Sequence, residues 1–286
     1  MTQPLIEHRR RFAGFDTRLL ELEGDGPPIV LFHGYADSAD TWRTLLHRLA
    51  RAERRAIAVD LPGFGTCAPL RQGRILPQLE RFGAAAVAYA AEDGDEVVAA
   101  GNSLGGCLSL LLGQRPELPL AGIVPIAPAG FDLARWIGMV ERDPILRTLL
   151  AIPTPLPEAV VREAVGRVYR VLAFARPGDI DARVVRAFTA HHRDRATVRR
   201  YLDTARRLLP ELADPYDLER VECPVLLVWG TRDRMVSAGG AETLRSALPD
   251  TEVVLLDGHG HCPQIEAADE VSDLLLGFPR ALPRAA

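Results

Sequence analysis

The chain of 286 residues contains no lysine, so all 34 of its basic residues are arginine. A lysine is needed to form a Schiff base, to anchor pyridoxal phosphate and to contact the phosphates in a P-loop, so these chemistries are excluded. The formal net charge of −4 also gives the chain no general attraction to nucleic acid. We therefore expect no nucleic-acid partner.

Cysteine is scarce: the four residues lie far apart and form no C-x-x-C pair. In a chain of this size, that pattern predicts reduced thiols in a cytoplasmic protein rather than a disulfide framework. The first residues contain no apolar stretch of signal-peptide length. The uncharged segment 97–114 approaches membrane-spanning length, but Gly, Asn and Ser interrupt it. We expect a strand, a turn and a helix there, and no integral membrane segment.

Short apolar runs, continuous rather than alternating, recur along the chain and predict strands that are buried on both faces. They lie at 28–32, 56–60, 96–101, 121–127, 224–230 and 252–257. Helical patterns follow at about 39–52, 77–91, 104–114, 240–248 and 264–276. This alternation predicts an α/β fold with a mostly parallel central sheet flanked by helices. The first segment, 6–23, fits an antiparallel hairpin at the edge of the sheet.

The strand patterns stop between Phe131 and Pro215. A proline-rich run begins this segment, and helical patterns follow at 158–174, 180–192 and 195–209. We expect a helical cap inserted after the sixth strand, so that a first part of the core covers 1–130, the cap 131–215 and a second part of the core 216–286. The cap is rich in arginine, which we interpret as solvated helix faces rather than as an anion site.

A serine stands where the strand at 96–101 meets the next helix. Gly101-Asn102-Ser103-Leu104-Gly105 fits G-x-S-x-G between a strand and a helix, which is the context that a nucleophile elbow requires. In such an elbow the serine takes a strained backbone conformation that exposes its hydroxyl. A Cβ on either glycine would collide with the neighbouring strand or helix. The helix that follows directs its positive end at the site.

A serine hydroxyl is a poor nucleophile at neutral pH, so it needs a base, and the base needs an orienting acid. In this fold class both partners follow the serine, with the acid first and the histidine second. Asp233 comes in the loop after the strand at 224–230. His259 and His261 share the loop after the next strand, and the spacing leaves both open as the base.

Five motifs, in register along nearly the whole chain, resemble the α/β-hydrolase fold family and in particular its capped, esterase-like serine hydrolases. The motifs are His33-Gly34-Tyr35, Asp60-Leu61-Pro62-Gly63-Phe64-Gly65, Gly101-Asn102-Ser103-Leu104-Gly105-Gly106, Gly230-Thr231-Arg232-Asp233 and Gly260-His261-Cys262-Pro263. The resemblance implies a catalytic triad of Ser103 as nucleophile, Asp233 as acid and His261 as base. It also implies an oxyanion hole formed by the backbone N–H groups of Tyr35 and Leu104.

Two alternatives concern the acid and the base. Asp132 follows the strand at 121–127, and some members of the family take their acid from that position. His259 is an alternative base, but the family pattern G-H-x-P-x-x-E matches residues 260–266 and so favours His261. The His-x-His spacing has no carboxylate or cysteine cluster beside it that would complete a metal site. We expect neither a metal nor a cofactor.

Several polar residues near these motifs have structural interpretations. His33 is expected to hold its own loop through a hydrogen bond, and Asp60 to order its own turn. Asn102 is expected to make local hydrogen bonds. His191 and His192 are expected on a solvated face of a cap helix.

The combined pattern predicts a cofactor-free serine hydrolase that cleaves a carboxylic ester or a related acyl bond of a small-molecule acyl substrate through an acyl-enzyme. One alternative is a carbon–carbon bond hydrolase of a vinylogous diketone, whose elbow is similar to 101–106. Against it, Tyr35-Ala36-Asp37-Ser38 replaces the glycine-rich loop typical of that subgroup, and Cys262 replaces a frequent tryptophan. The other alternative is a ligand-binding protein without catalysis on the same fold.

Overall fold

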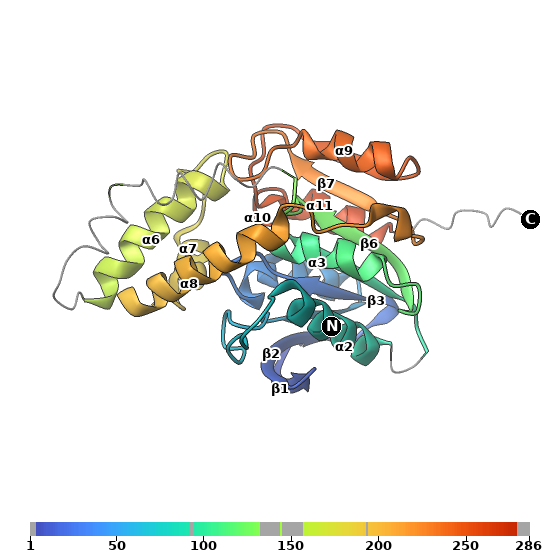
Figure 1. Cartoon of the computed structure of the whole chain (residues 1–286), viewed down its shortest axis with the longest axis horizontal. Coiled ribbons are helices and arrows are strands. Elements are labelled where there is room, and N and C mark those ends of the chain that lie inside the picture. Colours follow the sequence, from blue (N-terminus) through green and yellow to red (C-terminus); the bar gives the residue numbers. More distant parts are fainter. Residues whose placement is uncertain (1–3, 92–93, 132–143, 145–156, 193, 279–286) are drawn as a thin grey trace, which may run out of the picture.

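A computed structural model describes residues 4–91, 94–131, 144, 157–192 and 194–278. In this part of the chain an eight-stranded sheet is built from β1 (Ile6–Phe12), β2 (Phe15–Leu22), β3 (Asp25–Phe32), β4 (Arg54–Val59), β5 (Val97–Asn102), β6 (Leu120–Ile126), β7 (Leu226–Gly230) and β8 (Glu252–Leu256). The strand order is β1-β2-β4-β3-β5-β6-β7-β8 (Figure 1). β2 runs antiparallel to β1 and β4, and the other neighbours are parallel. The predicted edge hairpin and mostly parallel sheet are confirmed.

Helices cover both faces of the sheet. One hydrophobic core includes α1 (Arg43–Arg51) and α11 (Ala268–Leu276), and the other includes α2 (Leu76–Ala90), α3 (Leu104–Gly113) and α9 (Gly240–Ala247). Adjacent strand residues point to opposite faces, so Val30 belongs to one core and Leu31 to the other. Burial on both faces explains why the strands read as continuous apolar runs.

Two predicted helices are divided in the structure. The segment predicted at 39–52 consists of the 3-10 helix η1 (Ala39–Trp42) followed directly by α1. The segment predicted at 264–276 consists of α10 (Pro263–Glu266) and α11. The break falls at Ala267, whose backbone leaves the helical region with φ −129° and ψ 45°. The hydrophobic periodicity continues across that residue, which is why the pattern does not reveal the break.

The chain between β6 and β7 forms, within the described residues, α6 (Glu158–Ala173), α7 (Ala182–Thr189) and α8 (Arg195–Leu208). These helices lie together on one side of the sheet (Figure 1). The short 3-10 helices η2 (Leu209–Leu212) and η3 (Leu218–Arg220) then precede β7. We call α6, α7 and α8 the cap. The predicted boundaries 1–130, 131–215 and 216–286 stay a prediction, because 132–143 and 145–156 lie outside the described residues.

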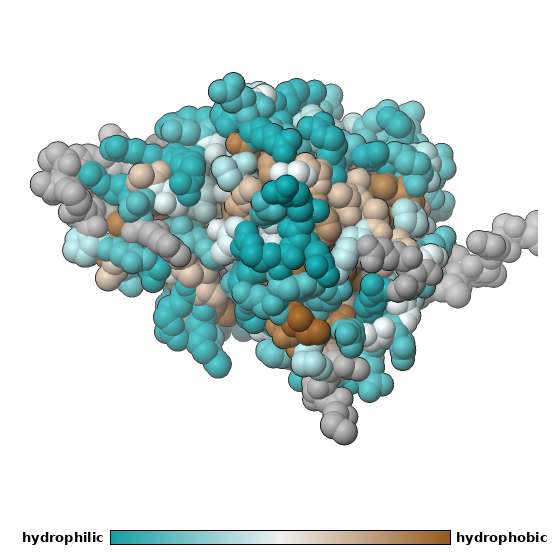
Figure 2. Space-filling view, turned by 90° about the horizontal axis from the view of Figure 1, so that it is seen from below, coloured by the Kyte–Doolittle hydropathy of each residue, from teal (hydrophilic) through white to brown (hydrophobic). Residues whose placement is uncertain are grey.

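Hydrophilic residues cover most of the face seen in Figure 2, with hydrophobic residues in smaller areas between them. Large apolar side chains with substantial exposure are found on three elements: Ile6 on β1, Val160 and Val171 on α6, and Leu255 on β8. In the part of the chain that the structure describes, we find no helix with the length and apolar character needed to cross a membrane.

Candidate active site

Ser103 occupies the sharp turn between β5 and α3. Its backbone has φ +56° and ψ −112°, a conformation that is costly for a residue with a side chain. The Ser103 N–H donates a hydrogen bond to the Ile126 carbonyl at 2.9 Å. The Ser103 carbonyl accepts hydrogen bonds from the N–H groups of Cys107 at 2.8 Å and Ala129 at 3.0 Å. Contacts with its own helix and with the chain around the end of β6 therefore hold the strained turn in place.

The glycines on either side of Ser103 allow the backbone to pass closely there. A Cβ on Gly101 would lie 2.2 Å from the Gly105 carbonyl oxygen. A Cβ on Gly105 would lie 2.1 Å from the Phe32 carbonyl oxygen on β3. Both distances are far inside van der Waals contact with backbone atoms that cannot easily move, so the collisions expected from the sequence are present.

His261 and Asp233 form a buried hydrogen-bonded pair. Nδ1 of His261 donates to Oδ2 of Asp233 at 2.7 Å, and the two side chains are 4% and 0% exposed. Asp233 is held in turn by the N–H groups of Met235 (2.7 Å) and Val236 (3.0 Å) and by Nε1 of Trp229 (3.1 Å). The acid therefore accepts four hydrogen bonds.

With its proton on Nδ1, the imidazole of His261 keeps a lone pair on Nε2. Nε2 is buried and has no hydrogen-bond partner within the described residues. His261 and Ser103 line the same cavity. The structure thus brings an imidazole nitrogen that can accept a proton to the cavity that the serine also reaches.

The alternative base, His259, does not reach this cavity within the described residues. Asp132 lies outside the described residues. His259 is absent from the described residues that line the cavity, and its carbonyl accepts a hydrogen bond from the Arg232 N–H at 2.8 Å. The described residues also contain no group of three or more His, Cys, Asp or Glu side chains arranged to hold a metal ion.

Tyr35 and Leu104 both lie beside the serine. Leu104 is the first residue of α3, and Tyr35 follows Gly34 in the loop after β3. A Cβ on Gly34 would lie 3.5 Å from the Ser103 Cβ, so this loop passes next to the serine. The Tyr35 hydroxyl donates to the Tyr201 carbonyl on α8. The loop after β3 is therefore linked to the cap.

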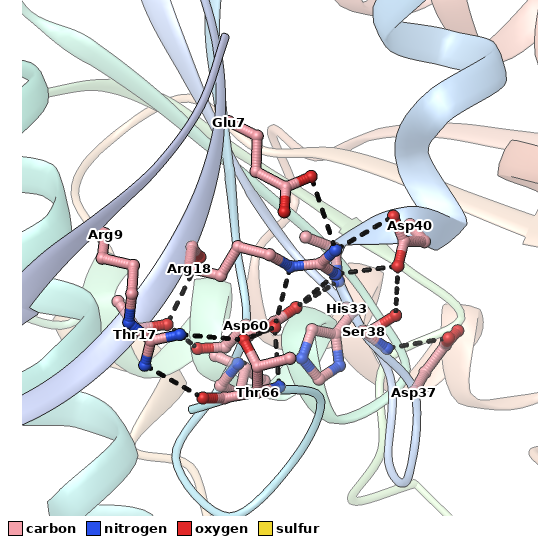
Figure 3. Close-up of polar contacts among 12 residues, drawn as sticks. Glu7, Arg9, Thr17, Arg18, His33, Asp37, Ser38, Asp40, Asp60 and Thr66 are labelled. Carbon is pink, nitrogen blue, oxygen red and sulfur yellow. Dashed lines mark hydrogen bonds and ion pairs between the residues drawn. The ribbon is translucent and has the colours of Figure 1, made fainter. Parts of the chain in front are cut away.

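A buried charge cluster anchors the far end of this loop (Figure 3). Arg18 on β2 donates to Asp60 through Nε at 3.1 Å and Nη2 at 3.2 Å, and its Nη2 also donates to Asp40 at 2.8 Å. Asp60, which is fully buried, accepts hydrogen bonds from the N–H groups of Ala39 and Thr66, both at 2.8 Å. Burial alone would raise the pKa of Asp60, but the Arg18 guanidinium holds it below its ordinary value. Asp60 thus orders its own turn, as expected, and also connects β2 and the loop after β3.

His33 fills the structural role that the sequence predicts. Its Nδ1 donates to the Gly34 carbonyl at 2.7 Å, and the Leu61 N–H donates to its Nε2 at 2.8 Å. Burial lowers the pKa of His33 to about 4, so the ring is neutral at neutral pH. A neutral imidazole provides the one donor and one acceptor that this loop requires.

A cavity of about 150 Å³ lies between these loops and the cap. Its cap side is mainly apolar, with Val165 and Leu172 from α6 and Val198 and Leu202 from α8. Such a wall suits a hydrocarbon portion of a substrate, because burying apolar surface is favourable by about 25 cal/mol per Å². The candidate triad residues Ser103 and His261 line the core side, so a bound substrate would lie between cap and core.

His192 corrects one expectation from the sequence. The prediction that His191 and His192 lie on a solvated helix face is wrong for His192, which is 3% exposed and lines the cavity. Its Nδ1 donates to the Phe188 carbonyl at 3.1 Å, and burial lowers its pKa to about 4. His192 lies beyond the last residue of α7, Thr189, so the helix expected to continue to residue 192 ends earlier and its periodicity does not place this side chain.

Asn102 corrects a second expectation. Its Nδ2 donates to the backbone carbonyl of His261 at 2.9 Å and more weakly to that of Ile126 at 3.3 Å. The predicted local hydrogen bonds of Asn102 are therefore wrong, because the side chain connects the elbow with the histidine loop 159 residues away. No pattern near Asn102 reveals a partner so distant in the sequence.

The histidine loop is also fixed to the end of α6. The His261 N–H donates to the Ala173 carbonyl at 2.8 Å. The Glu266 carboxylate accepts hydrogen bonds from the N–H groups of Gly260 at 2.6 Å and Ala175 at 2.9 Å. Glu266 is the last residue of G-H-x-P-x-x-E, and this geometry gives that position a physical role. It holds the histidine loop and the cap together.

Three curated proteins are similar to most of this chain. The dihydrolipoyllysine-residue acetyltransferase component of the acetoin cleaving system from Pseudomonas putida is 30% identical over 280 residues, covering 92% of this chain but 66% of that protein, just under two thirds. A pimeloyl-[acyl-carrier protein] methyl ester esterase from Xanthomonas campestris pv. campestris is 28% identical over 92% of this chain and 99% of that protein. A 2-hydroxy-6-oxo-6-(2'-aminophenyl)hexa-2,4-dienoic acid hydrolase from Metapseudomonas resinovorans is 28% identical over 96% of this chain and 90% of that protein.

Solved structures share the fold. A serine hydrolase involved in carbazole degradation superposes with a TM-score of 0.77 at 24% identity, over 96% of this chain and 98% of that one. The model of the Alpha/beta hydrolase family matches residues 29–274, which include the second half of β3, all later strands and the candidate triad and oxyanion-hole residues. On the strength of that match, the chain belongs to the alpha/beta hydrolase family.

Proposed function

We propose that the protein is a serine hydrolase that cleaves a carboxylic ester or a related acyl bond. In this proposal Ser103 is the nucleophile, His261 the base and Asp233 the orienting acid. The N–H groups of Tyr35 and Leu104 hold the oxyanion. The observation that carries the proposal is the Asp233–His261 hydrogen bond of 2.7 Å, which leaves Nε2 unpartnered within the described residues at the cavity that Ser103 lines.

The first half of the reaction forms the acyl-enzyme. Nε2 of His261 takes the hydroxyl proton as Oγ of Ser103 attacks the carbonyl carbon. The carbonyl oxygen becomes negative and accepts the two backbone N–H groups, one of which lies at the positive end of α3. The tetrahedral intermediate then collapses, the bond to the leaving oxygen breaks, and the imidazolium gives its proton to that oxygen.

The second half releases the acid. His261 takes a proton from water as the water oxygen attacks the acyl carbon, and it returns that proton to Oγ of Ser103 when the acyl bond breaks. Asp233 holds the imidazole in one orientation throughout and stabilises the imidazolium. The four hydrogen bonds that Asp233 accepts support this role, because they fix the carboxylate before the reaction begins.

The relatives support an acyl substrate. The Xanthomonas relative is named for methyl ester hydrolysis, and it is matched over nearly its full length. The apolar cap side of the cavity fits a hydrocarbon acyl chain or alcohol, and its volume of about 150 Å³ favours a small one. We therefore propose a small-molecule ester, without a cofactor.

Covalent labelling tests the proposal. A fluorophosphonate probe is expected to modify Ser103, located by mass spectrometry, and the Ser103→Ala protein is expected to lose both labelling and hydrolysis of p-nitrophenyl acyl esters. Ser246→Ala is the matched control, because that residue is at an exposed position of α9 and its hydroxyl bonds only the Glu242 carbonyl among the described residues. Absence of an adduct on Ser103 would instead favour a ligand-binding protein without catalysis.

Carbon–carbon bond hydrolysis is the second candidate. It is favoured by the Metapseudomonas relative, which is named as a dienoic acid hydrolase and matches 96% of this chain. The same serine, histidine and acid would serve that reaction. The test measures turnover of a vinylogous diketone through the loss of its absorbance. A kcat/KM for this substrate above that for any ester would make carbon–carbon bond hydrolysis the first candidate.

A further inference from the structure

Asp37 is a buried carboxylic acid in the wall of the cavity that the proposed reaction does not use. It follows the Tyr35-Ala36 segment of the loop after β3, is 6% exposed and lines the same cavity as Ser103 and His261. Ala36 beside it has φ +57°, so the loop accepts backbone strain to take this course. A carboxyl group in this position is costly unless something compensates it.

The contacts of Asp37 leave much of that cost uncompensated. Its Oδ1 accepts one hydrogen bond, from the Ser38 N–H at 2.8 Å. The Thr41 hydroxyl faces the carboxyl but does not reach hydrogen-bond geometry. Burial raises the pKa of Asp37 to about 7, and the nearby carboxylates of Asp40 and Asp60 add to the rise. Nothing on its own loop neutralises the group.

The described lining of the cavity around Asp37 carries an acidic group and no basic group of arginine type. Among the described residues that line it, Asp37 is the only carboxylic acid, and none is an arginine. The Asp37 charge also acts on Cys262 in the same cavity wall. Burial is the largest cause that raises the pKa of the Cys262 thiol, and the Asp37 charge is the next. Tyr169, Tyr35 and Tyr201 also line the cavity, and aromatic rings attract cations.

We propose that Asp37 is a specificity residue that receives a cationic group of the substrate, such as an ammonium, and disfavours a carboxylate there. A cation beside Asp37 would compensate the buried carboxyl and face the aromatic rings of the same wall. A substrate carboxylate would instead meet a like charge with no arginine among the described lining residues to offset it. This inference rests on the proposed function, since the cation is part of the hydrolysed ester.

Three methyl esters of equal chain length test the proposal. One acid ends in a trimethylammonium group, one has carbon in place of that nitrogen, and one ends in a carboxylate. A second set places the cation and its neutral counterpart in the alcohol instead. Acid release gives kcat/KM for three proteins: wild type, Asp37→Asn and Asp181→Asn. The Asp37→Asn change keeps an oxygen that can accept the Ser38 N–H. Asp181 is the matched control, because it caps α7 and does not line the cavity.

In one of the two sets, wild type is expected to prefer the cationic ester over its neutral counterpart by roughly 10-fold or more, the range of a partly desolvated cation interaction. Asp37→Asn should remove most of that preference and raise the relative rate for the carboxylate ester, whereas Asp181→Asn should keep the wild-type ratios. Equal preferences in wild type and Asp37→Asn would overturn the inference. So would a wild type that prefers the carboxylate ester.

Binding separates this inference from the proposed function. Calorimetry of the same esters with Ser103→Ala measures Kd without turnover, and the cationic ester should again bind more tightly by roughly 10-fold. Combining Asp37→Asn with Ser103→Ala should abolish that difference. If no ester is hydrolysed yet this binding preference is present, the proposed hydrolase function fails and the role of Asp37 is supported. If esters are hydrolysed but no preference exists, only the role of Asp37 fails.

Discussion

The core and the cap contribute to the site in different ways. The core fixes its buried carboxylates with polar contacts: Asp233 accepts four hydrogen bonds, and Asp60 is held by Arg18 and by two backbone N–H groups. The cap lines the cavity mainly with apolar side chains, such as Leu172 and Leu202. Directional contacts fix atoms to fractions of an ångström, whereas apolar contacts set volume and shape. Under the proposed function, the chemistry would belong to the core, and the cap would set the volume and shape of the cavity.

The two regions are joined at the C-terminal end of α6. Besides the Glu266 contacts, Nη1 of Arg234 donates to the Val171 carbonyl at 3.0 Å. Arg234 directly follows Asp233, so the acid loop and the histidine loop both hold the same end of the cap. A shift of the cap therefore reaches the reactive groups through backbone hydrogen bonds.

The largest expected effect concerns the acid. Asp233→Asn should lower kcat by up to about 10⁴, because the amide favours the wrong tautomer of His261 and does not stabilise the imidazolium. Stopped-flow or steady-state hydrolysis of a p-nitrophenyl ester measures it. If Asp233→Asn kept the wild-type rate, the role of the acid would pass to Asp132. The comparison between core and cap would then no longer hold for the acid.

The buried charge cluster of the core gives the next effect. Arg18→Leu should destabilise the fold by about 3–5 kcal/mol, because it leaves the fully buried Asp60 without its ionic partner. The control is Arg183→Leu on the cap, whose pair with Asp181 is exposed to solvent, so its loss should change the stability far less. Urea unfolding measures both. Equal losses at the two sites would contradict the view that polar contacts hold the core more firmly than the cap.

A pH effect follows from Asp37. Its pKa is raised from 3.8 to about 7 in the folded state, so the folded protein binds the proton more tightly than the unfolded chain does. Folding stability from this group is therefore full below about pH 4 and lost as the pH rises toward 7. The melting temperature of Asp37→Asn relative to wild type should increase between pH 5 and pH 8. A difference that falls with rising pH would place the Asp37 carboxyl in a compensated environment.

The smallest expected effect belongs to the cap. Leu202→Ala enlarges the apolar side of the cavity, so esters with a longer acyl chain should be preferred. The kcat/KM relative to wild type should rise by roughly 10-fold for each added methylene that the enlarged side accommodates. Val160→Ala is the control, because that side chain of α6 is exposed. A panel of p-nitrophenyl esters of increasing length measures the shift. A uniform loss at all lengths would mean that Leu202 supports the reactive groups instead.

The sequence predicts the core well because its signals are local. The elbow needs glycine on both sides of Ser103, the strands need continuous apolar runs, and each residue of the proposed triad lies in the turn or loop after a strand. These requirements leave marks within a few residues of the atoms concerned, which is why the mostly parallel sheet and the family resemblance could be read in advance.

The cavity could not be predicted in the same way. His192 and Asp37 reach it because cap helices and a loop pack against one another from distant parts of the chain. Asn102 likewise bonds a carbonyl 159 residues away. Helix periodicity distinguishes a buried face from a solvated one, but it does not say which buried face meets a substrate. The residues that line the cavity are therefore revealed only by the packed structure.

The most direct test of the central claim is a double-substitution cycle on kcat for p-nitrophenyl ester hydrolysis with Ser103→Ala, His261→Ala and both changes together. If the two side chains act as one unit, the double variant will be no slower than the slower single variant, because either change alone already removes the nucleophilic step. Losses that multiply in the double variant would show that the serine and the histidine act independently, and would contradict this account.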